Sequence, residues 1–174
     1  MAEFDPKALF SMSYGMYIVS SHLAEKANGQ IANAVMQTTA EPATITVCLN
    51  RENLTERCVQ ETGLFAVSVL QEEVPMTFIG TFGFKSGRDI DKFAGVDHVT
   101  GGLNIPVVRE WCLSAFEAKV TGRLNLGTHT LFAGEIVSAW VFKEGIPLTY
   151  ANYHLVKRGK SPKTAPTFAF NDMK

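Results

Sequence analysis

The chain has 174 residues, of which 46% are hydrophobic, so it has the size of one domain and enough apolar side chains to form a core. Sixteen Lys and Arg against seventeen Asp and Glu give a net charge of −1, which excludes a global positive field for nucleic acid or an anionic membrane. No apolar run reaches the roughly 18 residues of a membrane span, and the N-terminus has no apolar leader. We therefore expect a single domain over residues 1–174 with no membrane and no nucleic-acid partner.

Strand patterns dominate the first half of the chain. Residues 14–21 (YGMYIVSS) are rich in aromatic and β-branched side chains, and residues 63–70 (GLFAVSVL) form a second short apolar run. Residues 42–50 (PATITVCLN) alternate an apolar face with an uncharged polar face. The apolar face consists of Ile45, Val47 and Leu49. This face is predicted to point into the core.

Two longer strands are predicted in the second half. Residues 112–124 alternate in the manner of a half-exposed strand, with Glu117 and Lys119 on the polar side. Residues 128–142 are apolar on both faces, which indicates that a second subunit covers the outer face. Roughly six strands, too close together for helical crossovers, predict an antiparallel barrel.

Helical patterns are short. Residues 53–63 begin with Asn53 as an N-cap and end at Gly63, which predicts a helix of two to three turns. Residues 74–82 form a second candidate, with Pro75 in the first turn. The basic, proline-containing tail 157–168 is predicted to be irregular and to wrap the surface.

The segment 29–42 (GQIANAVMQTTAEP) mixes small, polar and apolar residues without a clean face. We predict that it pairs with residues 42–50 as a hairpin and presents amides and hydroxyls beside small residues that let a flat ring approach. The side chains concerned are Asn33, Met36, Gln37, Thr38, Thr46, Cys48 and Asn50. A plain hairpin with polar residues facing water explains the same pattern.

Two further segments carry groups that bind anions. Residues 50–55 place Asn53 and Thr55 at a helix N-terminus, although an ordinary cap has the same pattern. Residues 82–93 (FGFKSGRDIDKF) combine glycines with two cations and a hydroxyl, which suits a phosphate. A solvated turn is the alternative there. The chain has no Walker motif and no G-x-G-x-x-G motif.

Individual histidine, cysteine and tyrosine residues are weak signals on their own. His129 begins the most apolar strand, and a lone histidine is more often a structural residue than a catalyst. Cys48 is likewise more typical of a small core residue than of a reactive thiol. Tyr153 and His154 form a polar aromatic pair next to the basic tail. The three cysteines, which are Cys48, Cys58 and Cys112, form no C-x-x-C motif, so we expect a reducing, cytoplasmic location and no metal site.

Taken together, these segments resemble a known family. The ordered set of YGMYIVSS, GQIANAVMQTTAEPATITVCLNRENLT, GLFAVSVL, FIGTFGFKSGRDIDKF, GTHTLFAGEI and YANYHLVKRGKSPKTAP resembles the flavin-reductase-like family. The similarity covers about residues 5 to 168 and is greatest to the ferric reductase branch and to the flavin-reductase domains of high-molecular-weight rubredoxins and flavoredoxins. It implies a mainly β fold, a six-stranded Greek-key split barrel, in a homodimer with one FMN per subunit.

The resemblance also implies site residues. His129 and Cys48 would lie near the flavin and the nicotinamide or iron site as catalytic residues, with Tyr153 and His154 beside His129 in the substrate site. The expected FMN contacts are Asn33, Ala34, Val35, Met36, Gln37, Thr38, Cys48, Leu49, Asn50, Asn53, Thr55, Phe82, Phe84, Lys85, Ser86 and Arg88.

The implied activity follows from the cofactor. NAD(P)H would pass hydride to FMN, and electrons would leave to free flavin, a ferric complex or a rubredoxin-type protein. Two alternatives stay open: an FMN electron carrier that is reduced by a protein partner, and a barrel that has lost flavin. The sequence does not distinguish NADH from NADPH, because it has no dinucleotide motif that would place a ribose-reading residue.

Overall fold

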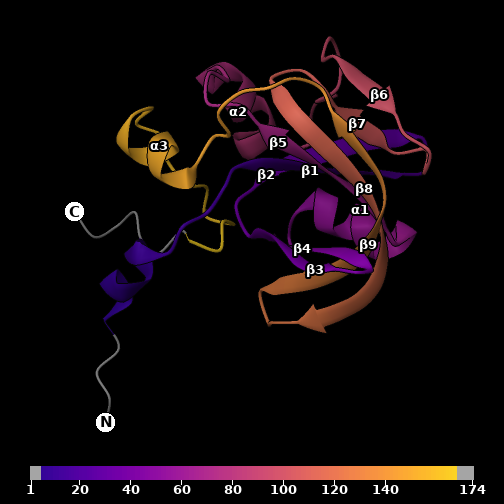
Figure 1. Cartoon of the computed structure of the whole chain (residues 1–174), viewed down its shortest axis with the longest axis horizontal. Coiled ribbons are helices and arrows are strands. Elements are labelled where there is room, and N and C mark those ends of the chain that lie inside the picture. Colours follow the sequence, from indigo (N-terminus) through magenta and orange to yellow (C-terminus); the bar gives the residue numbers. More distant parts are fainter. Residues whose placement is uncertain (1–4, 168–174) are drawn as a thin grey trace.

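The structure is a computed structural model that describes residues 5–167. Its centre is one antiparallel sheet with the strand order β2-β1-β5-β8-β9-β4-β3 (Figure 1). The strands are β1 (Tyr17–Leu23), β2 (Lys26–Ala32), β3 (Val35–Ala40), β4 (Ala43–Asn50), β5 (Leu64–Leu70), β8 (Cys112–Asn125) and β9 (His129–Val141). The long strands β8 and β9 curve across the molecule, and the predicted mainly β, antiparallel fold is confirmed (Figure 1).

The sheet has seven strands where six were expected, because the segment 29–42 is divided between two of them. Its first part belongs to β2, which pairs with β1, and its second part is β3, which pairs with β4. Only Asn33 and Ala34 separate these two strands, although they are the opposite edges of the sheet order. The three Cα–Cα steps from Ala32 to Val35 span about 11 Å at most, so the sheet must curl until its edges meet there. This crossing closes one end of the barrel.

The barrel interior holds the apolar faces predicted from the sequence. Val47 and Leu49 of β4 are fully buried, and they pack in one cluster with Phe65 of β5 and Phe132 of β9. Cys48 and the other alternate residues of β4 face away from this cluster. The period-two pattern of residues 42–50 therefore identified the correct core face.

Short helices flank the sheet. Helix α1 (Leu54–Thr62) begins after Asn53 and ends at Gly63, which has a left-handed backbone with φ of 68°, as predicted. Helix α2 (Met76–Phe84) follows Pro75 and matches the second predicted helix within two residues. The sequence pattern did not identify the 3₁₀ helix η1 (Pro6–Ser11) or helix α3 (Tyr150–Leu155). None of the helices within residues 5–167 is both long enough and apolar enough to cross a membrane.

The prediction that Glu117 faces solvent is wrong, because its side chain is fully buried. The alternation of β8 continues through this residue, because Phe116 and Ala118 pack in the barrel core while Glu117 lies with Ala115 on the opposite face. The two-stranded ribbon of β6 (His98–Thr100) and β7 (Pro106–Val108) covers this face of the sheet with a third apolar cluster. Glu117 accepts a hydrogen bond from the Leu103 N–H beneath that ribbon.

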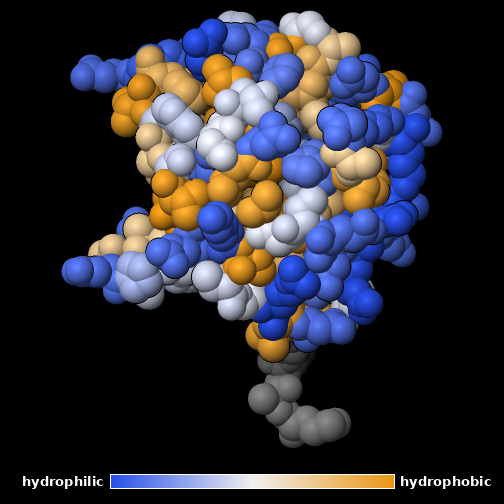
Figure 2. Space-filling model, turned by 90° about the vertical axis from the view of Figure 1, so that its right-hand side faces the viewer, coloured by the Kyte–Doolittle hydropathy of each residue, from blue (hydrophilic) through white to orange (hydrophobic). Residues whose placement is uncertain are grey.

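The face of the molecule seen in Figure 2 is mainly hydrophilic, with hydrophobic residues exposed in several places. On β9, Val137 is 43% exposed and Val141 is 83% exposed, so part of the doubly apolar strand faces solvent in the isolated chain. A second subunit on this strand stays a prediction.

Candidate functional site

A cavity of about 310 Å³ opens between the strands β2 and β4, the start of α1, the loop after α2 and the C-terminal residues 159–167, which we call the strap. This volume falls in the range of cofactor pockets. The predicted site residues that line the cavity are Asn33, Cys48, Asn50, Asn53, Thr55, Phe82, Phe84, Lys85, Ser86, Arg88 and Tyr153. The fold thus brings together segments that lie more than a hundred residues apart in the chain.

One wall of the cavity carries buried amides with unused hydrogen-bonding capacity. Asn28 and Gln30 of β2 both line the cavity, and within residues 5–167 the Asn28 Oδ1 and Gln30 Oε1 atoms have no hydrogen-bond partner. Buried polar atoms are normally paired, so this wall fits a ligand with a polar edge. The sequence reasoning missed both residues because it did not recognise 26–32 as a strand of its own.

The start of helix α1 forms one corner of the cavity, which we call the α1 corner. The Asn28 Nδ2 atom donates to Thr55 Oγ1 at 2.7 Å, which ties β2 to the first turn of α1. Asn53 makes no side-chain capping hydrogen bond, so the cap leaves the first N–H groups of the helix without a side-chain acceptor. These groups and the positive end of the helix dipole fit an anion, as the sequence predicted.

The loop after α2 folds against the same corner. Ser86 Oγ accepts a hydrogen bond from the Arg88 N–H at 3.1 Å, and the Arg88 guanidinium donates to the Glu52 carbonyl at 3.4 Å. A Cβ atom at Gly87 would lie 1.9 Å from Asn28 Oδ1, so only glycine fits there. The loop therefore brings its hydroxyl and its cation next to the start of α1.

The two phenylalanines of the α2 end have different environments. Phe82 is 1% exposed and packs between the rings of Phe78 and Phe93, at centroid distances of 5.4 and 5.6 Å. Phe84 is 54% exposed at the edge of the cavity. Phe82 therefore belongs to the core as well as to the cavity wall, whereas Phe84 is free to contact a ligand.

The strap closes one side of the cavity. The Tyr150 hydroxyl is hydrogen-bonded to Ser161 Oγ and, at 2.5 Å, to Thr167 Oγ1, while Asn33 Nδ2 donates to Thr167 Oγ1 at 3.2 Å. Ser161 and Thr167 are both buried. Residues 157–167 form no helix or strand, as predicted, but their strap portion is part of the cavity wall as well as of the surface. Residue 168 of the predicted tail lies outside the described residues.

Tyr153 and His154 hold the strap rather than facing the cavity together. The Tyr153 hydroxyl donates to the Lys160 carbonyl at 2.7 Å. The Nδ1 atom of His154 donates to the Gly159 carbonyl at 2.9 Å, so the neutral ring leaves Nε2 as an acceptor 3.3 Å from Ser161 Oγ. Burial lowers the pKa of His154, which favours this neutral form. Of the pair, only Tyr153 lines the cavity.

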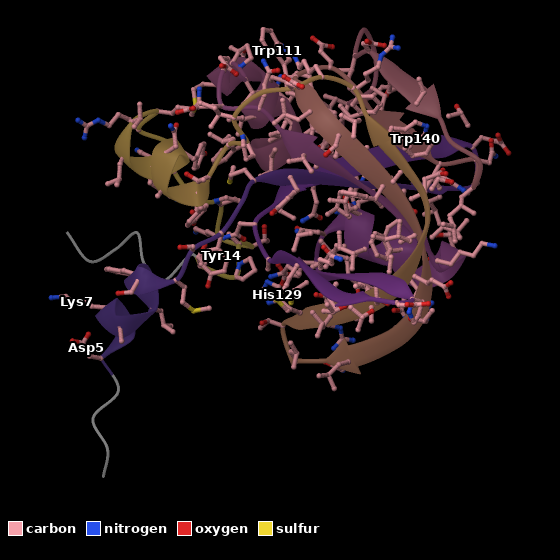
Figure 3. All side chains as sticks on the ribbon, in the orientation of Figure 1. Asp5, Lys7, Tyr14, Trp111, His129 and Trp140 are labelled. Atoms are coloured by element: carbon pink, nitrogen blue, oxygen red, sulfur yellow. The ribbon has the colours of Figure 1, made fainter. Side chains whose placement is uncertain are left out.

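The two predicted catalytic residues lie on neighbouring strands. Cys48 lines the cavity, and burial raises the pKa of its thiol, so it is neutral near pH 7. His129 is the first residue of β9 and pairs with Asn50 of β4 (Figure 3). Its Nδ1 atom lies 2.9 Å from Thr128 Oγ1, while its Nε2 atom is buried without a partner among the described residues. His129 is not among the residues that line the cavity.

Several of the predicted contacts lie away from the cavity. Leu49 is fully buried in the barrel core, and Val35 packs against the same core cluster. Met36 is 62% exposed, and the next residues of β3 are exposed as well. The predicted contacts outside the cavity lining are Ala34, Val35, Met36, Gln37, Thr38 and Leu49. Val35, Met36, Gln37 and Thr38 are on β3, beyond the crossing that holds Asn33, and Leu49 points into the barrel core. The contact of these residues with a cofactor stays a prediction.

Comparison with known proteins gives a consistent result. The profile of the flavin reductase like domain matches residues 9–158. The chain is 49% identical to a ferric-chelate reductase (NAD(P)H) from Archaeoglobus fulgidus, over 94% of this chain and 97% of that protein. It is 46% identical to a high molecular weight rubredoxin from Moorella thermoacetica, over 94% of this chain and 72% of that protein.

Solved structures share the fold. A flavoredoxin from Methanosarcina acetivorans superposes with a TM-score of 0.72 and 23% identity, over 84% of this chain and 80% of that chain. An FMN-binding protein from Thermus thermophilus superposes with a TM-score of 0.74 and 21% identity, over 86% of this chain and 91% of that chain.

Proposed function

The chain belongs to the flavin reductase-like family, and on that premise we propose that it is an FMN-dependent oxidoreductase that takes hydride from NAD(P)H and passes electrons to an external acceptor. The observation that carries this proposal is the 49% identity, over 94% of the chain, to a ferric-chelate reductase (NAD(P)H). The acceptor is a free flavin, a ferric complex or a rubredoxin-type redox protein.

The cavity residues fit FMN. The α1 corner, with Thr55, Ser86 and Arg88, has the N–H groups, hydroxyls and cation that suit a phosphate ester. The Asn28 amide belongs to this same corner, and the unpartnered amide oxygen of Gln30, two residues further along β2, suits the polar edge of an isoalloxazine ring. When bound, FMN would supply the chemistry, which is to accept hydride from a nicotinamide and to release electrons.

The protein's own part is to bind, to orient and to exclude water. Hydride transfer needs no general base, which agrees with a cavity wall in which Cys48 is a neutral thiol. The strap narrows the access of water on the side of Tyr150 and Asn33, because its buried Thr167 is hydrogen-bonded to both. Such a site must hold the flavin ring and the nicotinamide ring in position, and this requires no ionised side chain at the reacting atoms.

An anaerobic spectrum tests the proposal. The purified protein, saturated with FMN, is mixed with NADH or with NADPH, and the flavin absorption is followed with time. We expect one of the two nucleotides to bleach the flavin band within the mixing time, and subsequent addition of a ferric chelate to restore it. A flavin band that neither nucleotide bleaches, or a colourless protein that does not take up FMN, contradicts the proposal.

A second candidate function is an FMN electron carrier that receives its electrons from a protein partner. The observation in its favour is the strap, because residues 160–166 line the same cavity that a nicotinamide would have to enter. For this function, FMN should survive purification while both nucleotides reduce it slowly. The anaerobic spectrum separates the two functions, since only the enzyme bleaches rapidly.

We propose in addition that the active form is a homodimer. Large apolar side chains are exposed on the edge strand β3 and on the hairpin between β8 and β9: Met36 is 62% exposed, Leu124 56% and Leu126 52%. Burying such residues against a second copy removes apolar area from water. Light scattering after size exclusion should give twice the chain mass of 19.1 kDa. A monomer at micromolar concentration would contradict this proposal.

A further inference from the structure

The segment between the end of α3 and the strap is strongly basic. Residues 145–167 contain no Asp or Glu, and they include four cations within seven positions, which are Lys157, Arg158, Lys160 and Lys163. The whole chain has a net charge of −1, so this segment differs sharply from the rest of the protein. A local concentration of one charge sign attracts partners of the opposite sign, and here it favours an anionic partner.

Three of these four cations are available to a partner. The Lys157 ammonium donates to the Val74 carbonyl at 3.2 Å, which holds this side chain against the body of the protein. The other three, Arg158, Lys160 and Lys163, are exposed to solvent, and we call them the basic patch. Among residues 5–167, no ion pair includes a residue of the basic patch. Its positive charge is therefore not neutralised by contacts within the described chain.

The basic patch reaches the edge of the cavity. Lys160 and Lys163 line the cavity, whereas Arg158 lies outside it. The described cavity wall contains no Asp or Glu, and its other cations are Lys85, Arg88 and Lys92. Lys85 and Arg88 belong to the loop after α2, next to the corner that suits the flavin phosphate. The basic patch thus stays available to a second anion when FMN is bound.

Two exposed apolar side chains stand next to the basic patch. Leu155, the last residue of α3, is 73% exposed, and Val156 is 70% exposed. In Figure 1, α3 is well separated from β3 and from the hairpin between β8 and β9, which carry the proposed dimer contact. That contact therefore does not account for Leu155 and Val156. Apolar residues beside exposed cations are typical of a protein-binding surface, in which apolar contacts stabilise the complex and charges orient it.

We propose that the basic patch, together with Leu155 and Val156, is the docking surface for a small acidic iron protein that accepts electrons from the reduced flavin. This inference rests on the proposed function, since it takes reduced FMN in the cavity as the electron source. Hydride from NAD(P)H brings two electrons and one proton. Two partner molecules each take one electron, which reduces Fe³⁺ to Fe²⁺ in each of them, and the proton is released to solvent.

NAD(P)H is the other anion that enters this cavity, and the two half-reactions separate it from the acceptor. Arg158, Leu155 and Val156 do not line the cavity, so a nucleotide inside it does not require them. Nucleotide phosphates also gain nothing from two apolar side chains. A patch that binds the nucleotide affects flavin reduction, whereas a patch that binds the acceptor protein affects flavin reoxidation.

The salt dependence of reoxidation by an acidic protein provides the first test. The FMN-loaded protein is reduced anaerobically by stoichiometric titration with dithionite and is mixed in stopped-flow with an oxidised, acidic rubredoxin. Between about 20 mM and about 300 mM salt, the second-order rate constant should fall at least about threefold, because salt screens the attraction to the basic patch. Without the patch, a net charge of −1 would repel the acidic partner, and the rate constant would rise with salt.

Substitution outside the cavity provides the second test. Arg158→Glu reverses one charge of the basic patch, so reoxidation by rubredoxin at low salt should slow at least about fivefold, whereas reoxidation by the basic protein cytochrome c should not slow. Arg158→Lys keeps the charge and should keep the wild-type rate. Lys26→Glu, at the exposed start of β2, changes the net charge equally and should leave the rubredoxin rate within about twofold.

A third variant tests the apolar part of the surface. Leu155→Ser should slow reoxidation by rubredoxin at least about threefold at both salt concentrations, because salt does not screen apolar contacts. Ferric EDTA is a small anionic acceptor that makes no protein interface, so its rate should not change in this variant. Reduction of the flavin by NAD(P)H should stay at the wild-type rate in Arg158→Glu and in Leu155→Ser, since neither residue lines the cavity.

The outcomes are distinguishable. A rubredoxin rate constant that rises with salt, an equal loss in Lys26→Glu, or an effect of Arg158→Glu on flavin reduction alone would overturn the docking surface and leave the proposed function standing. A flavin that neither nucleotide reduces, with the rubredoxin response intact, would overturn the proposed function and keep the docking surface for an electron carrier. A protein that takes up no FMN would overturn both. If Arg158→Glu does not fold, the wild-type salt dependence decides alone.

Discussion

The Tyr150 hydroxyl makes two of the hydrogen bonds that hold the strap, and removing it should favour the open strap without unfolding the barrel. Tyr150→Phe deletes the oxygen that is hydrogen-bonded to Ser161 and to Thr167, while the ring itself keeps its edge contacts with Tyr14 and His154. Each net hydrogen bond contributes about 1 kcal/mol, so the closed strap should lose about 2 kcal/mol. This corresponds to an open population that is about thirtyfold larger.

Trypsin measures the open population directly, because the strap carries exposed cleavage sites at Lys160 and Lys163. When opening and reclosing are fast, the cleavage rate follows the population of the open form. The FMN-free Tyr150→Phe protein should therefore be cut in the strap about thirtyfold faster than the wild type. FMN should also dissociate faster from this variant if the strap helps to retain it.

Tyr14→Phe is the matched control. Tyr14 packs edge-on against Tyr150 at a centroid distance of 5.9 Å. Within residues 5–167 its hydroxyl donates to the Met12 sulfur and makes no hydrogen bond to the strap. It should leave the cleavage rate unchanged. A Tyr150→Phe rate within threefold of the wild type, or an equal acceleration in Tyr14→Phe, would refute the reasoning that the Tyr150 hydroxyl holds the strap closed.

Four further changes test the core and the site. Gly134→Ala places a Cβ 2.6 Å from a ring carbon of Phe65, so the free energy of unfolding in urea should fall by roughly 1–3 kcal/mol. An unchanged urea midpoint would show that the Phe65 ring moves aside without cost. Cys48→Ala removes a neutral thiol, so turnover should stay within about threefold, or under ~1 kcal/mol of barrier. His129→Ala should slow flavin reduction in stopped-flow while FMN stays bound, and normal turnover would exclude His129 from the site. Burial lowers the pKa of His154, so the neutral ring contributes to stability above its unfolded pKa of about 6.5, and this contribution is lost as the pH falls. Between pH 7 and pH 5, the free energy of unfolding in urea should therefore fall more in the wild type than in His154→Gln. Equal decreases in the two proteins would contradict this.

Local pattern was enough for much of the fold. Residues 42–50 alternate with a period of two, and the structure buries the predicted face of that strand. The limits of α1 also follow from local chemistry, because Gly63 takes the left-handed conformation that ends a helix. Glu117 shows where this reasoning stops, since a covering ribbon that leaves no local signal buries a residue that alternation places in solvent.

The candidate site was predictable in part, for a similar reason. The anion-binding groups in residues 50–55 and 82–93 were identified by type, and the fold places them in one corner of one cavity. Lys92 was not identified, because a lysine in a charged loop is expected to be exposed to solvent. Its burial results from packing against β2 and α2, which no local pattern indicates. The strap was predicted as irregular surface, yet it is part of the cavity wall.

By itself, the sequence determined the class of fold, the core faces of the main strands, the start and end of α1 and the kinds of chemical group available to a ligand. These depend on residues within a few positions of each other, where side-chain period and backbone preference act. Only the tertiary structure decided that the segment 29–42 splits between the two edges of the sheet, so that Asn33 faces the cavity while Met36 faces solvent. That division follows from barrel closure. The strands β5, β8 and β9, which lie between β1 and β4 in the sheet, come later in the chain, and they place β2 and β3 at its opposite edges.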